Sequence, residues 1–314
     1  MHDHTHTHIG DATKQTVSRL ALSLGLTLAF VAVEVLAGVA ANSLALLTDA
    51  AHNLTDVVAL GLSWYAVRLA TRPSNARKTY GYHRAGILVA LANAATLGII
   101  SLGIFYEAWQ RFLAPPEVQS GILIGVGLVA FAVNLGTALL VKKGSEHDLN
   151  LRSAFVHLMG DVLSTVGAVI AGVIIYFTGA NWLDALVSVF IAVLILWNAW
   201  GILRETVDIL LEATPRDVDM NAMIADMAQI KGVLGVHDLH VWSISSNLRT
   251  MSAHILIDDI AISGGATIQT AVNELVAQRY NISHATLQLE CSGCAPDVLY
   301  CDMNEAGYMQ AKGT

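Results

Sequence analysis

Six long apolar segments follow one another along the first two thirds of the chain. A helix needs about 20 largely apolar residues to cross the ~30 Å hydrocarbon core of a bilayer. Segments of that length cover residues 20–41, 44–70, 86–106, 120–141, 154–177 and 182–203. We therefore expect six transmembrane helices, and an even number of spans places both ends of the chain on one side of the membrane.

Beyond residue 211 the pattern changes to that of a small water-exposed domain. Apolar residues at helical spacing are followed by strict alternation in two strands, by a second helical pattern after Gly264 and Gly265, and by a last alternating strand. The residues that carry these patterns are Met223, Ile224, Met227 and Ile230, then Met251, Ala253, Ile255 and Ile257, then Ile268, Ala271, Val272, Leu275 and Val276, and finally Ala285, Leu287 and Leu289. The order predicts a ferredoxin-like αββαβ layer of about 80 residues, which needs support such as a second copy covering its open face.

Composition and charge agree with this division. Hydrophobic residues make up 54% of the chain and charged residues 13%, against about 25% charged in soluble domains. Residues 1–204 hold twelve Lys and Arg and eleven Asp and Glu, whereas residues 205–314 hold five and fourteen. An acidic domain repels nucleic acid and attracts cations.

Basic residues between the predicted spans indicate the orientation. Lys and Arg gather in short loops on the cytoplasmic side. One side has only Arg111, and the other has Arg68, Arg72, Arg77, Lys78, Arg84, Lys142, Lys143 and Arg152. Both termini and the acidic domain are thus expected in the cytoplasm.

The chain ends indicate a protein without a disulfide framework. Its three cysteines, Cys291, Cys294 and Cys301, all lie in the last 24 residues, which favours a reducing compartment. The N-terminus lacks the features of a signal peptide, so the first apolar segment is expected to remain. We expect a His-rich tail at 1–15, a transmembrane domain at 16–205, a metal-binding cytoplasmic domain at 206–290 and a Cys-containing tail at 291–314.

Two matching polar pairs interrupt the apolar segments. His52 and Asp56 lie in the second segment and His157 and Asp161 in the fifth, each pair four residues apart. That spacing stacks both side chains on one helix face, about 6 Å apart along the axis. Two such faces turned together would supply a tetrahedral set of two nitrogens and two oxygens, suited to Zn²⁺ and less well to Co²⁺ or Cd²⁺. The alternative is a hydrogen bond within each helix that serves packing.

The apolar segments also contain Asp49 and Glu34. Asp49 precedes His52 by three residues on nearly the same face and is a candidate for attracting the ion, or else a carboxylate near the interface. Glu34 has no visible partner and receives no role, although a proton relay is conceivable.

The chemistry of the four ligands indicates exchange of metal for protons. Imidazole and carboxylate ligands must lose protons to bind a metal, so a site that opens alternately to the two sides exchanges one for the other. No phosphate-binding G-x-x-x-x-G-K-[ST] and no H-E-x-x-H occur. A proton gradient remains as the energy source.

The chain resembles the zinc-transporting branch of the cation diffusion facilitator family over nearly its whole length. The resemblance is carried by the runs Ser43–Asp56, Tyr80–Ala85, Leu210–Pro215, His237–Trp242, Ser252–Ile255 and Thr286–Glu290, together with His157 and Asp161. It implies a homodimeric zinc/proton antiporter with six helices and a metal-sensing cytoplasmic domain, and His52 implies a preference for zinc over cadmium.

The resemblance also implies sites in the cytoplasmic part. His237, His254 and Glu290 match the family's metal cluster at the dimer interface, with His240 and His284 as nearby alternatives. Gln288 stands where some members have another His, which puts the occupancy of that site in question.

Further candidates lie at the two ends of the chain. Cys291 and Cys294 have metal-ligand spacing, and the tail could complete their site from the partner chain through His2, His4, His6 and His8. The alternative is a reduced, exposed thiol pair.

Two expectations concern the loop between the second and third spans. Arg84 and Glu212 resemble a charge interlock at the hinge above the cytoplasmic domain, worth ~1 kcal/mol or less as a surface pair. His83 resembles a zinc-binding loop histidine of eukaryotic relatives, or is an ordinary exposed histidine.

The favoured function is therefore proton-coupled export of divalent cations from the cytoplasm, in a bacterial inner membrane. The alternative is a membrane zinc sensor that binds without translocating, which has no need of four ligands at membrane depth. A metalloenzyme is disfavoured, because four protein ligands leave no open position for water.

Overall fold

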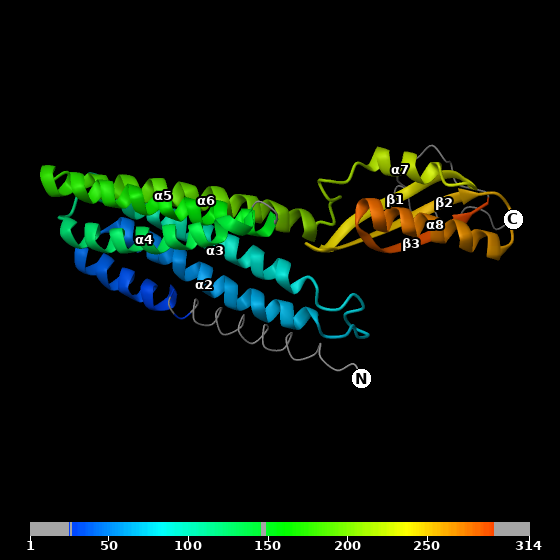
Figure 1. Cartoon of the computed structure of the whole chain (residues 1–314), viewed down its shortest axis with the longest axis horizontal. Coiled ribbons are helices and arrows are strands. Elements are labelled where there is room, and N and C mark those ends of the chain that lie inside the picture. The colour runs from blue at the N-terminus through cyan, green and yellow to red at the C-terminus, as the bar shows by residue number, and fades with distance from the viewer. Residues whose placement is uncertain (1–24, 26, 146–148, 292–314) are drawn as a thin grey trace, which may run out of the picture. The chain divides into compact units, whose positions relative to one another are not determined.

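The computed structural model of the chain describes residues 25, 27–145 and 149–291 (Figure 1). Within helices α4 and α5 it leaves the side chains of residues 140, 141, 143–145, 149–154 and 157 undescribed. The chain forms two compact units, one of Met1–Tyr65 with Val89–Leu203 and one of Ala66–Leu88 with Arg204–Thr314.

Helices occupy all six predicted membrane positions. A helix at Thr27–Ala41 is followed by α2 (Leu44–Ala70), α3 (Ala85–Leu113), α4 (Ser120–Ser145), α5 (Leu149–Thr178) and α6 (Trp182–Leu210). In the described part, α3, α4, α5 and α6 are long and apolar enough to cross a membrane. Helix α2 is long enough as well, at 27 residues. It is less apolar than these four because it carries the polar residues of the predicted metal site. Large apolar side chains such as Ile99, Phe177 and Trp197 point outward from these helices, as expected for contact with lipid.

Helices α4 and α5 approach each other closely at two glycines. A Cβ at Gly127 would lie 2.8 Å from Val169, and one at Gly172 would lie 2.9 Å from Ile124. Small residues let backbones approach inside a membrane, where packing holds helices together. Helix α5, which carries Asp161, is thus packed closely against α4.

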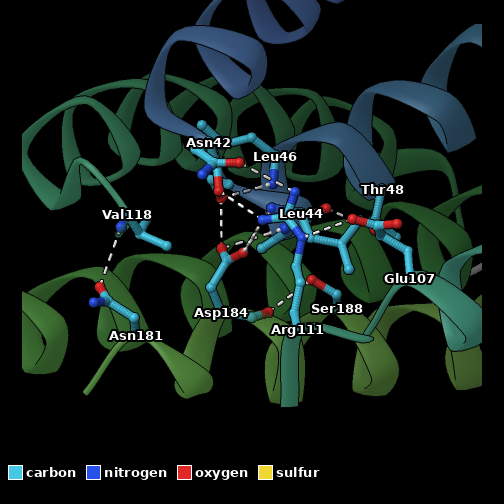
Figure 2. A network of polar contacts seen from close by, with 12 residues as sticks. Asn42, Leu44, Leu46, Thr48, Glu107, Arg111, Val118, Asn181, Asp184 and Ser188 are labelled. Carbon is cyan, nitrogen blue, oxygen red and sulfur yellow. Dashed lines mark hydrogen bonds and ion pairs between the residues drawn. The ribbon is translucent and has the colours of Figure 1, made fainter. Parts of the chain in front are cut away.

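The start of α2 is bound to α6 by a buried carboxylate (Figure 2). Asp184, in the first turn of α6, accepts a hydrogen bond from Ser43 Oγ at 2.5 Å and from the backbone N–H of Leu44 at 2.6 Å and of Ala45 at 3.3 Å. The first N–H groups of a helix have no partner within it, so Asp184 acts as the cap of α2 from another helix.

Helix α3 joins the same network through Arg111. Its guanidinium lies 3.8 Å from Asp184 and donates to the Asn42 carbonyl at 2.7 Å (Figure 2). Asn42 has a φ of 52° at the corner before α2. We expected the third span to end near residue 106, but α3 continues to Leu113, and this extension brings Arg111 to the network.

The C-terminal domain has the predicted αββαβ order. Its elements are α7 (Met220–Ala228), β1 (Val233–Ser245), β2 (Leu248–Ile257), α8 (Ile262–Tyr280) and β3 (Ile282–Glu290). In the described part the strands form one sheet in the order β1-β2-β3, with β1 antiparallel and β3 parallel to β2. The predicted fold class is confirmed.

Both helices of this domain cover one face of the sheet. Met223 and Met227 of α7 and Val272 and Val276 of α8 share one core with the inward residues of β2, such as Ile255. Burial alternates along β2, where Met251, Ala253, Ile255 and Ile257 are buried. Helix α8 begins at Ile262, so Gly264 and Gly265 belong to its first turn instead of preceding it.

A polar contact joins the two helices of the domain. Tyr280 Oη donates to Asp226 of α7, and Arg279 Nη1 lies 2.6 Å from the same carboxylate. Burial, followed by the hydrogen bond to Asp226, raises the pKa of Tyr280 to about 12.

Candidate metal centres

Three of the four predicted membrane ligands lie together at the meeting of α2 and α5. His52 Nε2 is 3.6 Å from Asp56 Oδ2 on the next turn of α2 and 3.5 Å from Asp161 Oδ1 of α5. The His52 and Asp161 side chains are 8% and 13% exposed, whereas that of Asp56 is 35% exposed. A face of α2 and a face of α5 thus converge on one imidazole.

These separations suit a small divalent ion. Ligand atoms at 2.0–2.2 Å from a tetrahedral zinc lie about 3.4 Å from one another, close to the two distances around His52. His157 belongs to α5, one turn before Asp161, and its side chain lies outside the described part. The complete set of four ligands therefore stays a prediction.

Polar side chains continue from this site toward the helix at Thr27–Ala41. Asn53 Nδ2 donates to Glu34 Oε2 at 3.1 Å, and Ser164 Oγ donates to Asp49 Oδ1 at 3.3 Å. Glu34 is fully buried and Asp49 is 5% exposed. Asp49 thus lies inside the protein, and its role in attracting the ion stays a prediction.

The second candidate centre lies on the sheet of the C-terminal domain. His237, His254 and Glu290 offer ligand atoms that all lie within 4.8 Å of one another, and no other group of three meets that criterion among the described residues. Glu290 bridges the rings, with Oε2 at 3.1 Å from His237 Nε2 and Oε1 at 3.1 Å from His254 Nδ1.

Strand register brings these residues together. His237 of β1 pairs with His254 of β2, which pairs with Gln288 of β3. Gln288 Nε2 donates to Glu290 Oε1 at 2.7 Å, so the glutamine orients the bridging carboxylate.

The ring nitrogens of His237 support a metal at this cluster. Both are buried, and neither has a hydrogen bond of acceptable geometry within the described chain. Buried polar atoms are almost always satisfied. An ion ligated by His237, His254 and Glu290 would satisfy one of the two.

Sequence reasoning missed Asp238 at this cluster. Its Oδ2 lies 3.7 Å from His254 Nε2 and its Oδ1 lies 3.1 Å from His240 Nε2. The pairing of β1 is irregular between His237 and His240, and Asp238 has a φ of 46°. A bulge of this kind redirects a side chain, and the only signal in the sequence was a carboxylate next to a candidate ligand.

The remaining candidates are distributed over the second unit. Arg84 Nη2 lies 3.0 Å from Glu212 Oε1, with both side chains exposed. His83 and His284 line one open cavity with Tyr80. Cys291 is a free, exposed cysteine, whereas Cys294 and the N-terminal His2, His4, His6 and His8 lie outside the described residues.

Comparison with known proteins assigns both parts of the chain. Residues 20–211 match the sequence model of the cation efflux transmembrane domain, and residues 215–292 match that of the cation efflux protein cytoplasmic domain. The zinc transporter ZitB of Escherichia coli (strain K12) is 35% identical over 307 residues, which cover 97% of this chain and 96% of ZitB.

Other relatives are similar over comparable lengths. The cadmium, cobalt and zinc/H(+)-K(+) antiporter of Bacillus subtilis (strain 168) is 35% identical over 288 residues, 91% of each chain. Among solved structures, the metal-bound C-terminal domain of the CzcD transporter from Cupriavidus metallidurans is 25% identical, with a TM-score of 0.22, and covers 23% of this chain and 99% of its own.

Proposed function

This chain belongs to the cation diffusion facilitator family of cation efflux proteins, and we propose that it exports divalent cations, chiefly Zn²⁺, from the cytoplasm in exchange for protons. The observation that carries the proposal is the position of His52 Nε2, 3.6 Å from Asp56 and 3.5 Å from Asp161 inside the membrane helices. Ionisable groups at membrane depth are costly and mark ion pathways.

Exchange follows from the chemistry of these ligands. A divalent ion binds to the neutral imidazole of His52 and to the ionised carboxylates of Asp56 and Asp161, with His157 as the fourth ligand. Protonation of the same groups releases the ion. A site that is open to one side at a time therefore lets an inward proton gradient drive the ion outward.

The ligand set also favours a particular cargo. Two imidazoles and two carboxylates suit Zn²⁺, and Cd²⁺ and Co²⁺ bind such a set with less preference. Relatives are named for zinc alone or for cadmium, cobalt and zinc together. We therefore place Cd²⁺ and Co²⁺ as secondary substrates.

In this proposal the chain acts as a homodimer in a bacterial inner membrane, with both termini in the cytoplasm. The basic loops between the spans support a cytoplasmic position for both termini. The match of residues 215–292 to the cytoplasmic domain of cation efflux proteins supports the same position for the C-terminal domain. A metal held by His237, His254 and Glu290 on the open face of the sheet would regulate transport or stabilise the dimer.

Zinc uptake into proteoliposomes tests the proposal. With an acidic lumen, the wild type is expected to accumulate zinc at a rate that follows the pH gradient. Asp161→Ala removes one ligand and should lower the rate by more than about 100-fold, since losing even an outer partner of a ligand costs 10–100-fold. Glu117→Ala removes a carboxylate from the exposed α3–α4 loop and should transport normally, as should Cys291→Ser.

The sensor alternative predicts a different result. Zinc would bind to the wild type without crossing, and the pH gradient would change nothing. Normal uptake by Asp161→Ala would overturn the site assignment.

A further inference from the structure

A basic loop connects α2 and α3. Residues 57–106 include five Lys and Arg and no Asp or Glu. Three of the five, Arg72, Arg77 and Lys78, lie in the loop itself, and all three are exposed. Among the described residues, none of the three forms an ion pair. Their charges are therefore available to an anionic partner.

The loop contains a tight turn that fixes the positions of two of these cations. Asn75 and Lys78 exchange two backbone hydrogen bonds, at 3.1 and 3.0 Å. Asn75 Oδ1 also accepts from the backbone N–H groups of Arg77 and Lys78, at 3.0 and 3.1 Å, and Asn75 Nδ2 donates to Tyr82 Oη at 3.3 Å. Lys78 Nζ lies 5.7 Å from the centre of the Tyr82 ring, within the range of a cation–π contact. The turn thus presents two adjacent cations in a defined arrangement.

The same two cations line an open cavity together with apolar residues of both neighbouring helices. Leu69 of the last turn of α2 and Leu88 of the first turn of α3 also line it. The carboxylate in the cavity belongs to Glu212, which pairs with Arg84 at 3.0 Å. The cavity therefore offers both cationic and apolar groups, which suits an amphiphilic anion better than a small hydrated one.

Exposed aromatic residues place this loop near the lipid head groups. Trp64 and Tyr65, close to the end of α2, are 64% and 55% exposed, and exposed Trp and Tyr gather at the membrane–water interface. Helix α2 ends at Ala70, about 9 Å beyond Trp64 along its axis. The head-group region of one leaflet is about 5–8 Å thick, so the loop begins close to the phosphate groups.

We propose that Arg77 and Lys78, on the turn fixed by Asn75, bind the phosphate of an anionic phospholipid such as phosphatidylglycerol. The apolar part of the lipid contacts Leu69 and Leu88. A guanidinium donates two parallel hydrogen bonds to phosphate oxygens, and an ammonium adds a compact charge. General attraction of basic loops to anionic membranes depends on the number of charges, whereas this site also depends on the turn. The site goes beyond the proposed transport function and does not depend on it.

Lipid binding to the full-length protein tests the site. Native mass spectrometry of the protein in detergent measures the dissociation constants of phosphatidylglycerol and of phosphatidylcholine with the same acyl chains, and we expect the wild type to prefer phosphatidylglycerol. Arg77→Gln combined with Lys78→Gln should weaken phosphatidylglycerol binding about 25-fold, at about fivefold per cation. Phosphatidylcholine binding should not change. Both side chains are exposed, so the variant should fold, and an unchanged Tm checks this.

Two further variants separate a built site from general electrostatic attraction. Asn75→Ala keeps every charge but removes the side chain that fixes the turn, and it should weaken phosphatidylglycerol binding by about fivefold. Lys142→Gln combined with Lys231→Gln removes two charges from other exposed positions and should leave binding unchanged. Unaltered binding by Asn75→Ala overturns the proposal, and so does a loss in this control as large as in the Arg77 and Lys78 variant. Displacement of the lipid by an equal concentration of glycerol phosphate would also contradict it, because the ligand would then be a soluble phosphate.

Discussion

Two buried carboxylates of the membrane helices, Asp184 and Glu34, differ in how their charge is compensated. Asp184 accepts from Ser43 and from two backbone N–H groups of α2, with Arg111 at 3.8 Å (Figure 2). Glu34 has one donor among the described residues, Asn53, and its other oxygen is buried without a partner there. Asp184 is thus held by several fixed groups, whereas Glu34 has a single hydrogen-bond donor among the described residues.

The difference lies in the number of fixed donors. A helix N-terminus and a guanidinium are permanent partners for a carboxylate, and Asp184 has both. Both groups are buried carboxyl groups of the membrane helices, so burial alone does not distinguish them, and the number of fixed donors does.

Removing Asp184 is expected to have the largest effect on stability. Asp184→Ala leaves two N–H groups and the Ser43 hydroxyl without an acceptor and removes the countercharge of Arg111. Breaking a buried, hydrogen-bonded charge cluster costs about 3–5 kcal/mol. Thermal unfolding in nanodiscs should show a large fall in Tm for this variant.

Two controls sharpen that measurement. Ser43→Ala removes a single hydrogen bond to a charged group, worth about 1.5–3 kcal/mol, and should give a smaller fall. Glu117→Ala should unfold like the wild type. If Asp184→Ala unfolds like Glu117→Ala, the cap on α2 does not stabilise the membrane domain.

A third compensated carboxylate lies in the water-exposed domain and should matter less. Asp226 accepts from Tyr280 and pairs with Arg279, but water can replace such partners near a surface. Tyr280→Phe should therefore lower the free energy of unfolding by only about 1 kcal/mol at pH 7.

The pH dependence of this contact gives a second readout. The pKa of Tyr280 is raised to about 12 in the folded state, first by burial and then by the Asp226 hydrogen bond, from about 10 in the unfolded chain. Its contribution is thus fully present below pH 10 and is lost as the pH rises toward 12. Tyr280→Phe should lack this alkaline loss, and an equal loss in both proteins would contradict the assignment.

Sequence patterns predicted the elements better than the contacts between them. Apolar length and alternation indicated the membrane helices and the αββαβ domain, and the i, i+4 spacing of His52 and Asp56 placed both on one face. The partner of Asp184 could not be predicted, because Ser43 lies 141 residues away and helix periodicity carries no information on which turns of two helices meet.

The same limit applies to both candidate sites. Glu34 had no visible partner in the sequence, since Asn53 donates to it only once the first two helices fold back on each other. Asp238 was missed because an irregular strand pairing, rather than strict alternation, directs its side chain. Local spacing identifies ligands that one element supplies, whereas ligands brought by register or by bulges require the fold.

Replacing Glu34 is expected to have the smallest effect on stability. This expected effect contrasts most strongly with that of replacing Asp184. Glu34→Gln keeps the size of the side chain and an oxygen that accepts from Asn53, so the free energy of unfolding should change by less than about 1 kcal/mol without metal. Thermal unfolding of the metal-free protein measures this beside Asp184→Ala. A fall in Tm as large as that of Asp184→Ala would mean that the charge of Glu34 is also held by fixed partners, and the two carboxylates would then stabilise the membrane domain in the same way.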